Sequence, residues 1–236
     1  MRPQVRPRLE PRALFDEMAK TYGIVHVISS LGFAFFWRRQ CAKAIDKESR
    51  VVLDVMSGAG EMVPILIRHI RCDAKIRLVD FSTGMCDRAQ KNSKRWKREH
   101  LEVVNEDALS LSCPDNEFDA VTCSFGLKTL TTNEVDQFAA ELWRVTKTNG
   151  TVSLLEFSVP RSRFLYPFFK LYVKHYVPLL GRILLGNPDN YRMLWEYTSE
   201  FKSCRGVIQN FERVGFQTRF YSHFFGCATQ IVAVKV

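Results

Sequence analysis

The segment that most constrains this chain is Val51–Glu61, where an apolar strand pattern runs into a glycine turn. Val51–Val55 is rich in β-branched residues and Gly58-Ala59-Gly60 follows it closely. Apolar side chains then recur at helical spacing from Met62 to Ile70. A strand, a tight turn and a helix in this order are typical of a nucleotide-binding α/β fold, whose ligand lies at the carboxyl end of the strand.

A second strand pattern supports a nucleotide ligand. Ile76–Asp80 is apolar and ends in an acid twenty residues after Gly60. An acid at this place accepts hydrogen bonds from both hydroxyls of a ribose. We therefore expect an adenosine-containing cofactor, with contacts from the following residues of the two strand ends: Asp54, Ser57, Gly58, Ala59, Gly60, Asp80, Phe81 and Met85.

The loop favours S-adenosylmethionine over a dinucleotide. A dinucleotide fingerprint needs a third small residue where this chain has Val63, and Glu61 puts a negative charge where a pyrophosphate would lie. Acids at both ends of the loop suit a ligand that carries an ammonium group and no phosphate. S-adenosylmethionine combines adenosine, a sulfonium and an amino acid, and NAD is the alternative.

Three later strand patterns place further polar groups. Asp107 and Ala108 follow Leu101–Val104, where the acid can accept from an adenine amino group or serve as a turn or cap. Ser124, near the end of the strand Phe118–Phe125, would face the reactive end of the cofactor. Glu156 lies inside the strand Thr151–Phe157, and an acid there is costly to bury without a partner. It is either a catalytic base or a salt-bridged structural acid.

The strand and helix patterns predict one α/β domain, residues 13–236, with a Rossmann-like sheet of five parallel strands and a closing antiparallel hairpin, Gln217–Phe224 and Ala228–Val234. Residues 1–12, rich in Arg and Pro, are expected to form a flexible basic arm. Residues 13–48 predict a helical cap over the pocket. Tyr22 in this cap is a candidate for cofactor contact and for catalysis.

Residues 160–200 interrupt the alternation of strands and helices and are crowded with aromatic side chains. A long insertion of this kind predicts a substrate lid, and its character predicts an apolar substrate. His175 is the base candidate with the most suitable unperturbed pKa, and its alternative role is packing or surface exposure. The residues expected to bind substrate are Phe125, Lys128, Thr129, Tyr172, Tyr191 and Trp195.

The formal charge of +9 fits a solvated basic surface or attraction to an anionic partner. Lys170, Lys174 and Arg182 are compatible with peripheral contact to a membrane, whereas the basic run Lys91–Arg98 is better interpreted as a solvated helix end than as a nucleic-acid site. Seven cysteines without metal spacing predict reduced thiols in the cytoplasm and no metal. No signal-peptide or membrane-spanning pattern is present, and a homo-oligomer is compatible with the sequence.

From about Phe15 to its end, the chain resembles the ubiquinone/menaquinone biosynthesis C-methyltransferase family, within the class I S-adenosylmethionine-dependent methyltransferases. Three blocks look specific to this family: Ser124-Phe125-Gly126-Leu127, Leu155-Glu156-Phe157-Ser158 and Pro178-Leu179-Leu180-Gly181-Arg182. The resemblance implies cofactor contacts at Ala59, Asp80, Asp107, Ala108 and Ser124. It also implies a prenylated ring as substrate, methylated on carbon, with S-adenosylhomocysteine as the second product.

The chain departs from this family where the substrate would lie. After Phe-Gly-Leu the family usually has Arg-Asn, a pair thought to help activate the ring hydroxyl, but this chain has Lys128-Thr129. We therefore expect C-methylation of an apolar prenyl-bearing specialised metabolite, such as a terpenoid or prenylated indole, at an alkene carbon with carbocation formation and cyclisation. The alternatives are a ring methyltransferase for demethylmenaquinol or a ubiquinol precursor, and a non-catalytic scaffold that binds the cofactor.

Overall fold

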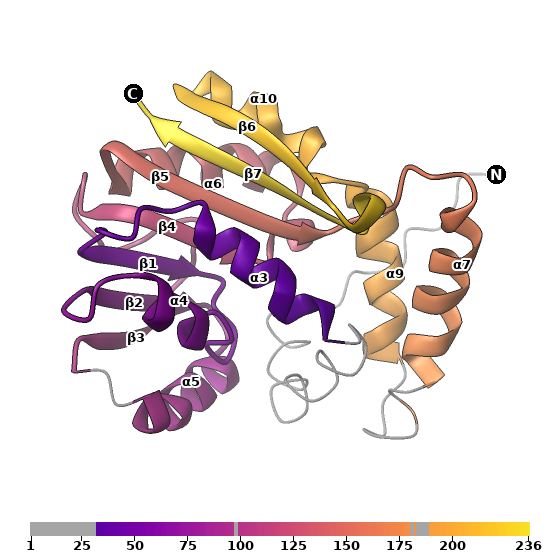
Figure 1. The fold of residues 1–236 in the computed structure, drawn as a ribbon, viewed down its shortest axis with the longest axis horizontal. Coiled ribbons are helices and arrows are strands. Elements are labelled where there is room, and N and C mark those ends of the chain that lie inside the picture. The colour runs from indigo at the N-terminus through magenta and orange to yellow at the C-terminus, as the bar shows by residue number, and fades with distance from the viewer. Residues whose placement is uncertain (1–31, 97–98, 180–181, 183–188) are drawn as a thin grey trace.

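The computed structural model describes residues 32–96, 99–179, 182 and 189–236, and only the backbone of 189–192. Its central sheet has the strand order β3-β2-β1-β4-β5-β7-β6 (Figure 1). The strands are β1 (Val51–Val55), β2 (Lys75–Asp80), β3 (Leu101–Asn105), β4 (Phe118–Ser124), β5 (Thr146–Phe157), β6 (Phe216–His223) and β7 (Ala228–Lys235).

The pairing confirms the predicted architecture. The first five strands pair with one another in parallel, and β7 and β6 complete the sheet as antiparallel strands. The helices are α3 (Phe33–Lys43), α4 (Val63–His69), α5 (Thr83–Trp96), α6 (Thr132–Val145), α7 (Leu165–Leu171), α9 (Asp189–Phe201) and α10 (Ile208–Arg213). Shorter turns are 3-10 helices at Leu127–Thr129, Cys204–Val207 and Phe224–Gly226, and a π-helix at Tyr172–Tyr176.

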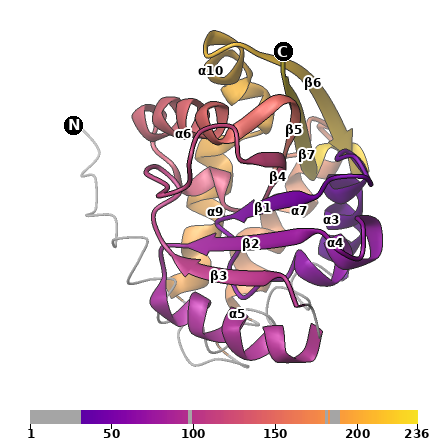
Figure 2. The same cartoon turned by 90° about the vertical axis from the view of Figure 1, so that its left-hand side faces the viewer.

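Helices cover both faces of the sheet, with α3 and α4 on one face and α6 and α10 on the other (Figure 2). Each face has its own apolar core: Phe138, Phe211 and Leu142 on the second face, Trp37, Leu66 and Met62 on the first. The strand order reverses at β1, because the chain runs from β1 through β2 to β3 at one edge and then crosses back to place β4 on the other side of β1. Such a reversal opens a crevice at the carboxyl ends of these strands.

Local sequence explains where the flanking helices start. The Ser82 hydroxyl accepts a hydrogen bond from the Met85 amide at 3.1 Å and so caps α5. α6 begins at Thr132, because Thr131 and Glu134 form a reciprocal capping box.

β5 is longer than predicted. The strand begins at Thr146 rather than at the predicted Thr151, so Thr148-Asn149-Gly150 lies within it. The register against β4 shifts between Phe118 and Ala120, and Asn149 has a φ of 65°. The extra residues therefore form an irregularity in a continuous strand rather than a turn before it.

The predicted basic arm and Tyr22 lie outside the described residues, whereas α3 falls inside the predicted cap and α7 and α9 inside the predicted lid. In the ranges that the structure describes, no helix combines the length and the apolar character needed to cross a bilayer.

Candidate functional site

A cleft opens at the carboxyl ends of β1, β2 and β4, where the strand order reverses. Ten of the residues expected to bind cofactor or substrate line it: Ser57, Gly58, Asp80, Phe81, Met85, Asp107, Ala108, Ser124, Phe125 and Thr129. Seven residues that we did not predict also line it: Arg38, Met56, Glu61, Leu109, Gly126, Leu130 and Glu134.

Asp80 organises the floor of the cleft. One carboxylate oxygen accepts from the Gly58 amide at 2.8 Å, and the other accepts from the Ser82 amide at 3.0 Å. The carboxylate at the end of β2 thereby holds the glycine loop that follows β1. A Cβ on Gly58 would lie 2.9 Å from the Glu61 carboxylate, and Gly58 has a φ of 59°, so the loop requires glycine here.

Three carboxylates gather at this loop. Asp54 is buried at the end of β1, where its Oδ1 accepts from the Thr122 hydroxyl at 2.7 Å. Its Oδ2, Oε1 of Glu61 and the Ser57 hydroxyl are buried without a hydrogen-bond partner. Burial raises the pKa of Asp54 to about 7, with added repulsion from Glu61 and Asp80, while the Thr122 hydrogen bond and the Arg38 charge oppose the rise.

Buried acceptors without donors are expensive unless a ligand supplies the missing hydrogen bonds or charge. Clustered carboxylates repel one another, and a bound cation removes that repulsion. The cleft residues therefore fit a cationic ligand such as S-adenosylmethionine, which carries a sulfonium and an ammonium group. They do not fit the pyrophosphate of a dinucleotide.

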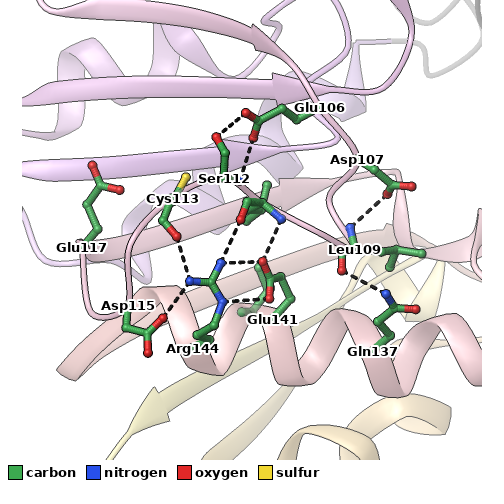
Figure 3. Close-up of polar contacts among 12 residues, drawn as sticks. Glu106, Asp107, Leu109, Ser112, Cys113, Asp115, Glu117, Gln137, Glu141 and Arg144 are labelled. Carbon is green, nitrogen blue, oxygen red and sulfur yellow. Dashed lines mark hydrogen bonds and ion pairs between the residues drawn. The ribbon is translucent and has the colours of Figure 1, made fainter.

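A loop fixed on α6 forms the wall of the cleft at Asp107, Ala108 and Leu109 (Figure 3). The Arg144 guanidinium donates to the carbonyls of Cys113 at 2.7 Å and Leu111 at 3.0 Å. The same side chain is held by the carboxylates of Glu141 and Asp115, and Gln137 donates to the Leu109 carbonyl at 3.1 Å. The loop is thus anchored along its length.

Within that loop, Asp107 Oδ1 accepts from the Leu109 amide at 2.9 Å. This is the turn role that the sequence left open for Asp107. The residue also lines the cleft, and its other carboxylate oxygen receives no hydrogen bond from the described residues. The two roles are therefore compatible, since the turn orients a carboxylate that still faces the ligand site.

The residues after β1 and β4 have unusual backbones. Met56 has a φ of 52° and Phe125 a φ of 67°, both in the left-handed region that side chains rarely adopt. A Cβ on Gly126 would lie 2.5 Å from the Met56 sulfur. The chain turns sharply at both strand ends, and such strained positions cluster at ligand sites.

Arg38 supplies the cleft with a positive charge from α3. Its side chain is buried, its Nε donates to the Ser124 hydroxyl at 3.3 Å, and its guanidinium carbon lies 5.0 Å from the centre of the Phe125 ring. The guanidinium thus lies at the β4 side of the cleft, away from the Asp107 wall. A binding partner for a carboxylate is a suitable role for this cation.

Two loop residues expected to contact the cofactor do not line the cleft. Ala59 is buried, and its carbonyl accepts from the Asn92 amide at 3.1 Å. Gly60, with a φ of 81°, lies against Trp96, whose ring a Cβ would approach to 2.5 Å. Gly60 therefore makes room for helix packing, and the aromatic of the basic run is a packing residue.

Glu156 is fully buried and paired. One carboxylate oxygen accepts from Lys128 Nζ at 2.9 Å and from the Phe157 amide at 2.7 Å, and the other accepts from the Lys128 amide at 3.0 Å. Lys128 Nζ also donates to the Phe125 carbonyl at 2.6 Å. The structural role that the sequence left open for Glu156 accounts for all these contacts, and neither residue lines the cleft.

The predicted lid residues behave differently from the strand ends. Tyr172 stacks on Tyr176 with ring centroids 5.1 Å apart, and Trp195 packs against the core on the α3 side. His175 is exposed. None of these three lines the described cleft, and the Tyr191 side chain lies outside the described residues.

The unpredicted lining residues carried weak sequence signals. Arg38 stands in a basic pair after Trp37, which is typical of any helix surface. Glu134 is recognisable as a helix cap, and Leu109 and Leu130 are ordinary apolar loop residues. Glu61 was visible as the acid of the glycine loop, and the residue lines the cleft.

Sequence relatives cover nearly the whole chain. A demethylmenaquinone methyltransferase of Deinococcus radiodurans is 34% identical over 94% of this chain and 91% of the relative. A demethylmenaquinone methyltransferase of Streptomyces avermitilis is 35% identical over 87% of this chain and 85% of the relative. The ubiquinone/menaquinone biosynthesis C-methyltransferase UbiE of Desulfotalea psychrophila is 31% identical over 89% of this chain and 84% of the relative.

Solved structures match the fold. A putative S-adenosyl-L-methionine-dependent methyltransferase of Methanococcus maripaludis aligns with a TM-score of 0.64 at 18% identity, covering 94% of each chain. The ubiE/COQ5 methyltransferase family matches residues 8–235. With a class I fold, a cation-accepting cleft and relatives over nearly its full length, the chain belongs to the ubiE/COQ5 family of S-adenosylmethionine-dependent methyltransferases.

Proposed function

We propose that this enzyme methylates a ring carbon of a quinol precursor of the menaquinone or ubiquinone type. The match to relatives named for demethylmenaquinone and for ubiquinone/menaquinone biosynthesis, over most of both chains, carries the proposal. The specialised terpenoid or prenylated indole that the sequence led us to expect first has no such support, so the quinol alternative replaces it as the main interpretation.

S-adenosylmethionine, when bound, supplies an electrophilic methyl group. Among the residues that line the cleft, Asp80 accepts from the ribose, Asp107 accepts from the adenine amino group, and the Glu61 carboxylate balances a positive charge. Asp54, which we also expected to contact the cofactor, does not line the cleft, and its buried carboxylate adds negative charge near the glycine loop. Arg38 binds the carboxylate of the methionine moiety beside Ser124. Two of these groups, Oδ2 of Asp54 and Oε1 of Glu61, are buried without a hydrogen-bond partner, and a cationic ligand would supply the missing charge.

The residues of this chain must then align a ring carbon with the methyl group and keep water out. Phe125, Met56 and Leu130 give the cleft an apolar side on which a flat ring can lie. In the overall reaction a carbon–methyl bond replaces a ring carbon–hydrogen bond, S-adenosylhomocysteine leaves and one proton is released. Loss of the quinol hydroxyl proton makes the ring carbon nucleophilic, and its return restores the quinol.

The test is an assay with methyl-labelled S-adenosylmethionine and a reduced, short-chain demethylmenaquinol. We expect label on the ring and an equal amount of S-adenosylhomocysteine. Prenylated indoles and other terpenoids are assayed in parallel. Label found only on a prenyl carbon would overturn the quinol proposal, and cofactor binding without release of S-adenosylhomocysteine for any substrate would favour a scaffold.

One observation keeps methylation of a prenyl alkene as a second candidate. The two residues that replace the usual Arg-Asn are occupied within the fold, since Lys128 binds Glu156 and Phe125, and the Thr129 hydroxyl donates to the Gly126 carbonyl at 2.7 Å. An alkene needs no hydroxyl activation before it attacks the methyl group. The cation that it would leave could be stabilised by the Phe125 ring face.

A further inference from the structure

An outward apolar stripe runs along α7. Phe164, Phe168 and Leu171 recur at a spacing of four and three residues, which places them on one side of a helix. Their exposed fractions are 88%, 71% and 62%. Single exposed apolar residues are ordinary on a protein surface, but a helical stripe of two phenylalanines and a leucine marks an interaction site.

The opposite side of α7 and of the turn that continues it packs against the rest of the protein. Phe169, Val173 and Val177 are buried, and the Phe169 ring lies 5.1 Å from the ring of Phe157 at the end of β5. The helix is therefore anchored through its inner side. Its outer stripe has no packing partner in the part of the chain that the structure describes, and α7 lies at the margin of the molecule beyond α9 (Figure 1).

The charged residues of the segment that carries the stripe have one sign. From Phe157 to Pro188 the sequence contains no Asp or Glu, but it contains Arg161, Arg163, Lys170, Lys174 and Arg182. Lys170 and Lys174 are exposed within α7 and the π-helical turn that continues it. Aromatic and aliphatic side chains flanked by lysines are the composition of helices that lie in the interface of an anionic bilayer.

We propose that this outer face, made of Phe164, Phe168, Lys170, Leu171 and Lys174, docks the enzyme on the surface of a membrane that contains anionic lipid. The apolar side chains enter the boundary between headgroups and acyl chains, and the two lysines pair with lipid phosphates. A second copy of the chain is a poorer partner, because its identical face would bring the same positive charges together.

This docking brings the cleft close to the membrane. The π-helical turn Tyr172–Tyr176 packs against α9, and α9 packs against the turn Leu127–Thr129, whose Thr129 lines the cleft. A membrane-embedded apolar substrate would then reach the cleft from the same side of the molecule. The docking inference itself rests on the surface of α7 and holds for any apolar substrate.

Co-sedimentation with vesicles tests the inference without any methylation assay. The whole chain is mixed with phosphatidylcholine vesicles that contain either no anionic lipid or about one third phosphatidylglycerol. We expect binding to the anionic vesicles that weakens at high salt, and little binding to the neutral ones. Phe164→Ser/Phe168→Ser and Lys170→Glu/Lys174→Glu should each weaken partition by at least about tenfold.

Lys91→Glu/Lys94→Glu is the matched control, because it changes the net charge by the same amount at exposed positions of α5. This variant should bind anionic vesicles within about twofold of the wild type. Equal losses in the control and in Lys170→Glu/Lys174→Glu would reduce the effect to net charge and overturn the docking face. Binding that none of the α7 substitutions changes would also overturn it, as would a wild-type dimer that Phe164→Ser/Phe168→Ser converts to monomer without any vesicle binding.

Discussion

The strand ends around the cleft and the helical segment from α7 to α9 differ in how directly their side chains follow from the sequence. At the strand ends, Asp80, Ser57 and Ser124 converge on one cleft as predicted. In the helical segment, His175 is exposed and Tyr172 packs on Tyr176. Parallel pairing fixes where a strand ends and points, whereas an aromatic stripe on a helix fits a core, a pocket or a membrane equally well.

The largest effect is expected where the two regions meet, at the ion pair of Lys128 and Glu156. Lys128→Met leaves a fully buried carboxylate without its counter-charge, which should lower the free energy of unfolding by about 3–5 kcal/mol. Urea denaturation measures this. Lys128→Arg keeps the charge and should retain most of the stability.

A double substitution sharpens the result. Lys128→Met/Glu156→Gln removes both charges and should recover part of the loss, because no ionised group stays buried. If Lys128→Met keeps wild-type stability but loses turnover, the ion pair is catalytic rather than structural. The strand ends and the helical segment would then not differ at this ion pair.

The next effect concerns the floor of the cleft. Asp80→Ala removes the proposed ribose acceptor and releases the Gly58 and Ser82 amides, so we expect S-adenosylmethionine to bind at least about 100-fold more weakly. Asp107→Ala, on the exposed adenine side, should cost about tenfold or less. Isothermal titration calorimetry of both variants decides this, and equal losses would contradict the central role given to Asp80.

The sequence predicted the sheet and the cleft floor because strand periodicity, the acid at each strand tip and the glycine turn act over a few residues. It could not predict Arg38, since the pairing of α3 with β4 joins residues 86 positions apart. The sequence also suggested that Gly60 lets the ligand approach the backbone. In the structure, Gly60 is needed because the Trp96 ring, more than thirty residues away in the chain, packs against it. Local patterns specify elements, while side-chain partners depend on packing between distant elements.

A smaller effect on affinity is expected from Arg38, and a ligand without the carboxylate tests its proposed role directly. Arg38→Met should weaken S-adenosylmethionine binding by about thirtyfold, because it removes a buried charge that faces the ligand carboxylate. Decarboxylated S-adenosylmethionine should bind both proteins alike. Arg39→Met, at the exposed neighbouring position, is the control and should change neither affinity. A loss that is the same for both ligands would assign Arg38 to packing on Phe125.

The pH dependence of S-adenosylmethionine binding tests the charge state of Asp54. Its pKa in the ligand-free fold is about 7, above the ordinary value of 3.8, so this group favours folding below about pH 4, and the contribution is lost as pH rises to about 7. A cationic ligand prefers the ionised acid, so affinity for S-adenosylmethionine should rise by up to about tenfold from pH 6 to pH 8. Asp54→Asn should flatten that rise, and an equally steep rise in this variant would assign the titration to another group.

The smallest effect is expected in the π-helical turn that continues α7, where the sequence suggested a base. His175 is exposed and does not line the described cleft, so His175→Ala should keep kcat and KM within about twofold when a short-chain, water-soluble substrate is used. The soluble substrate matters, because it separates chemistry in the cleft from docking on a membrane. A loss of kcat by 100-fold or more would mean that the π-helical turn after α7 moves inward during turnover. The strand ends and the helical segment would then form one site. Which aromatic side chains face the cleft would depend on the bound substrate rather than on the fold alone.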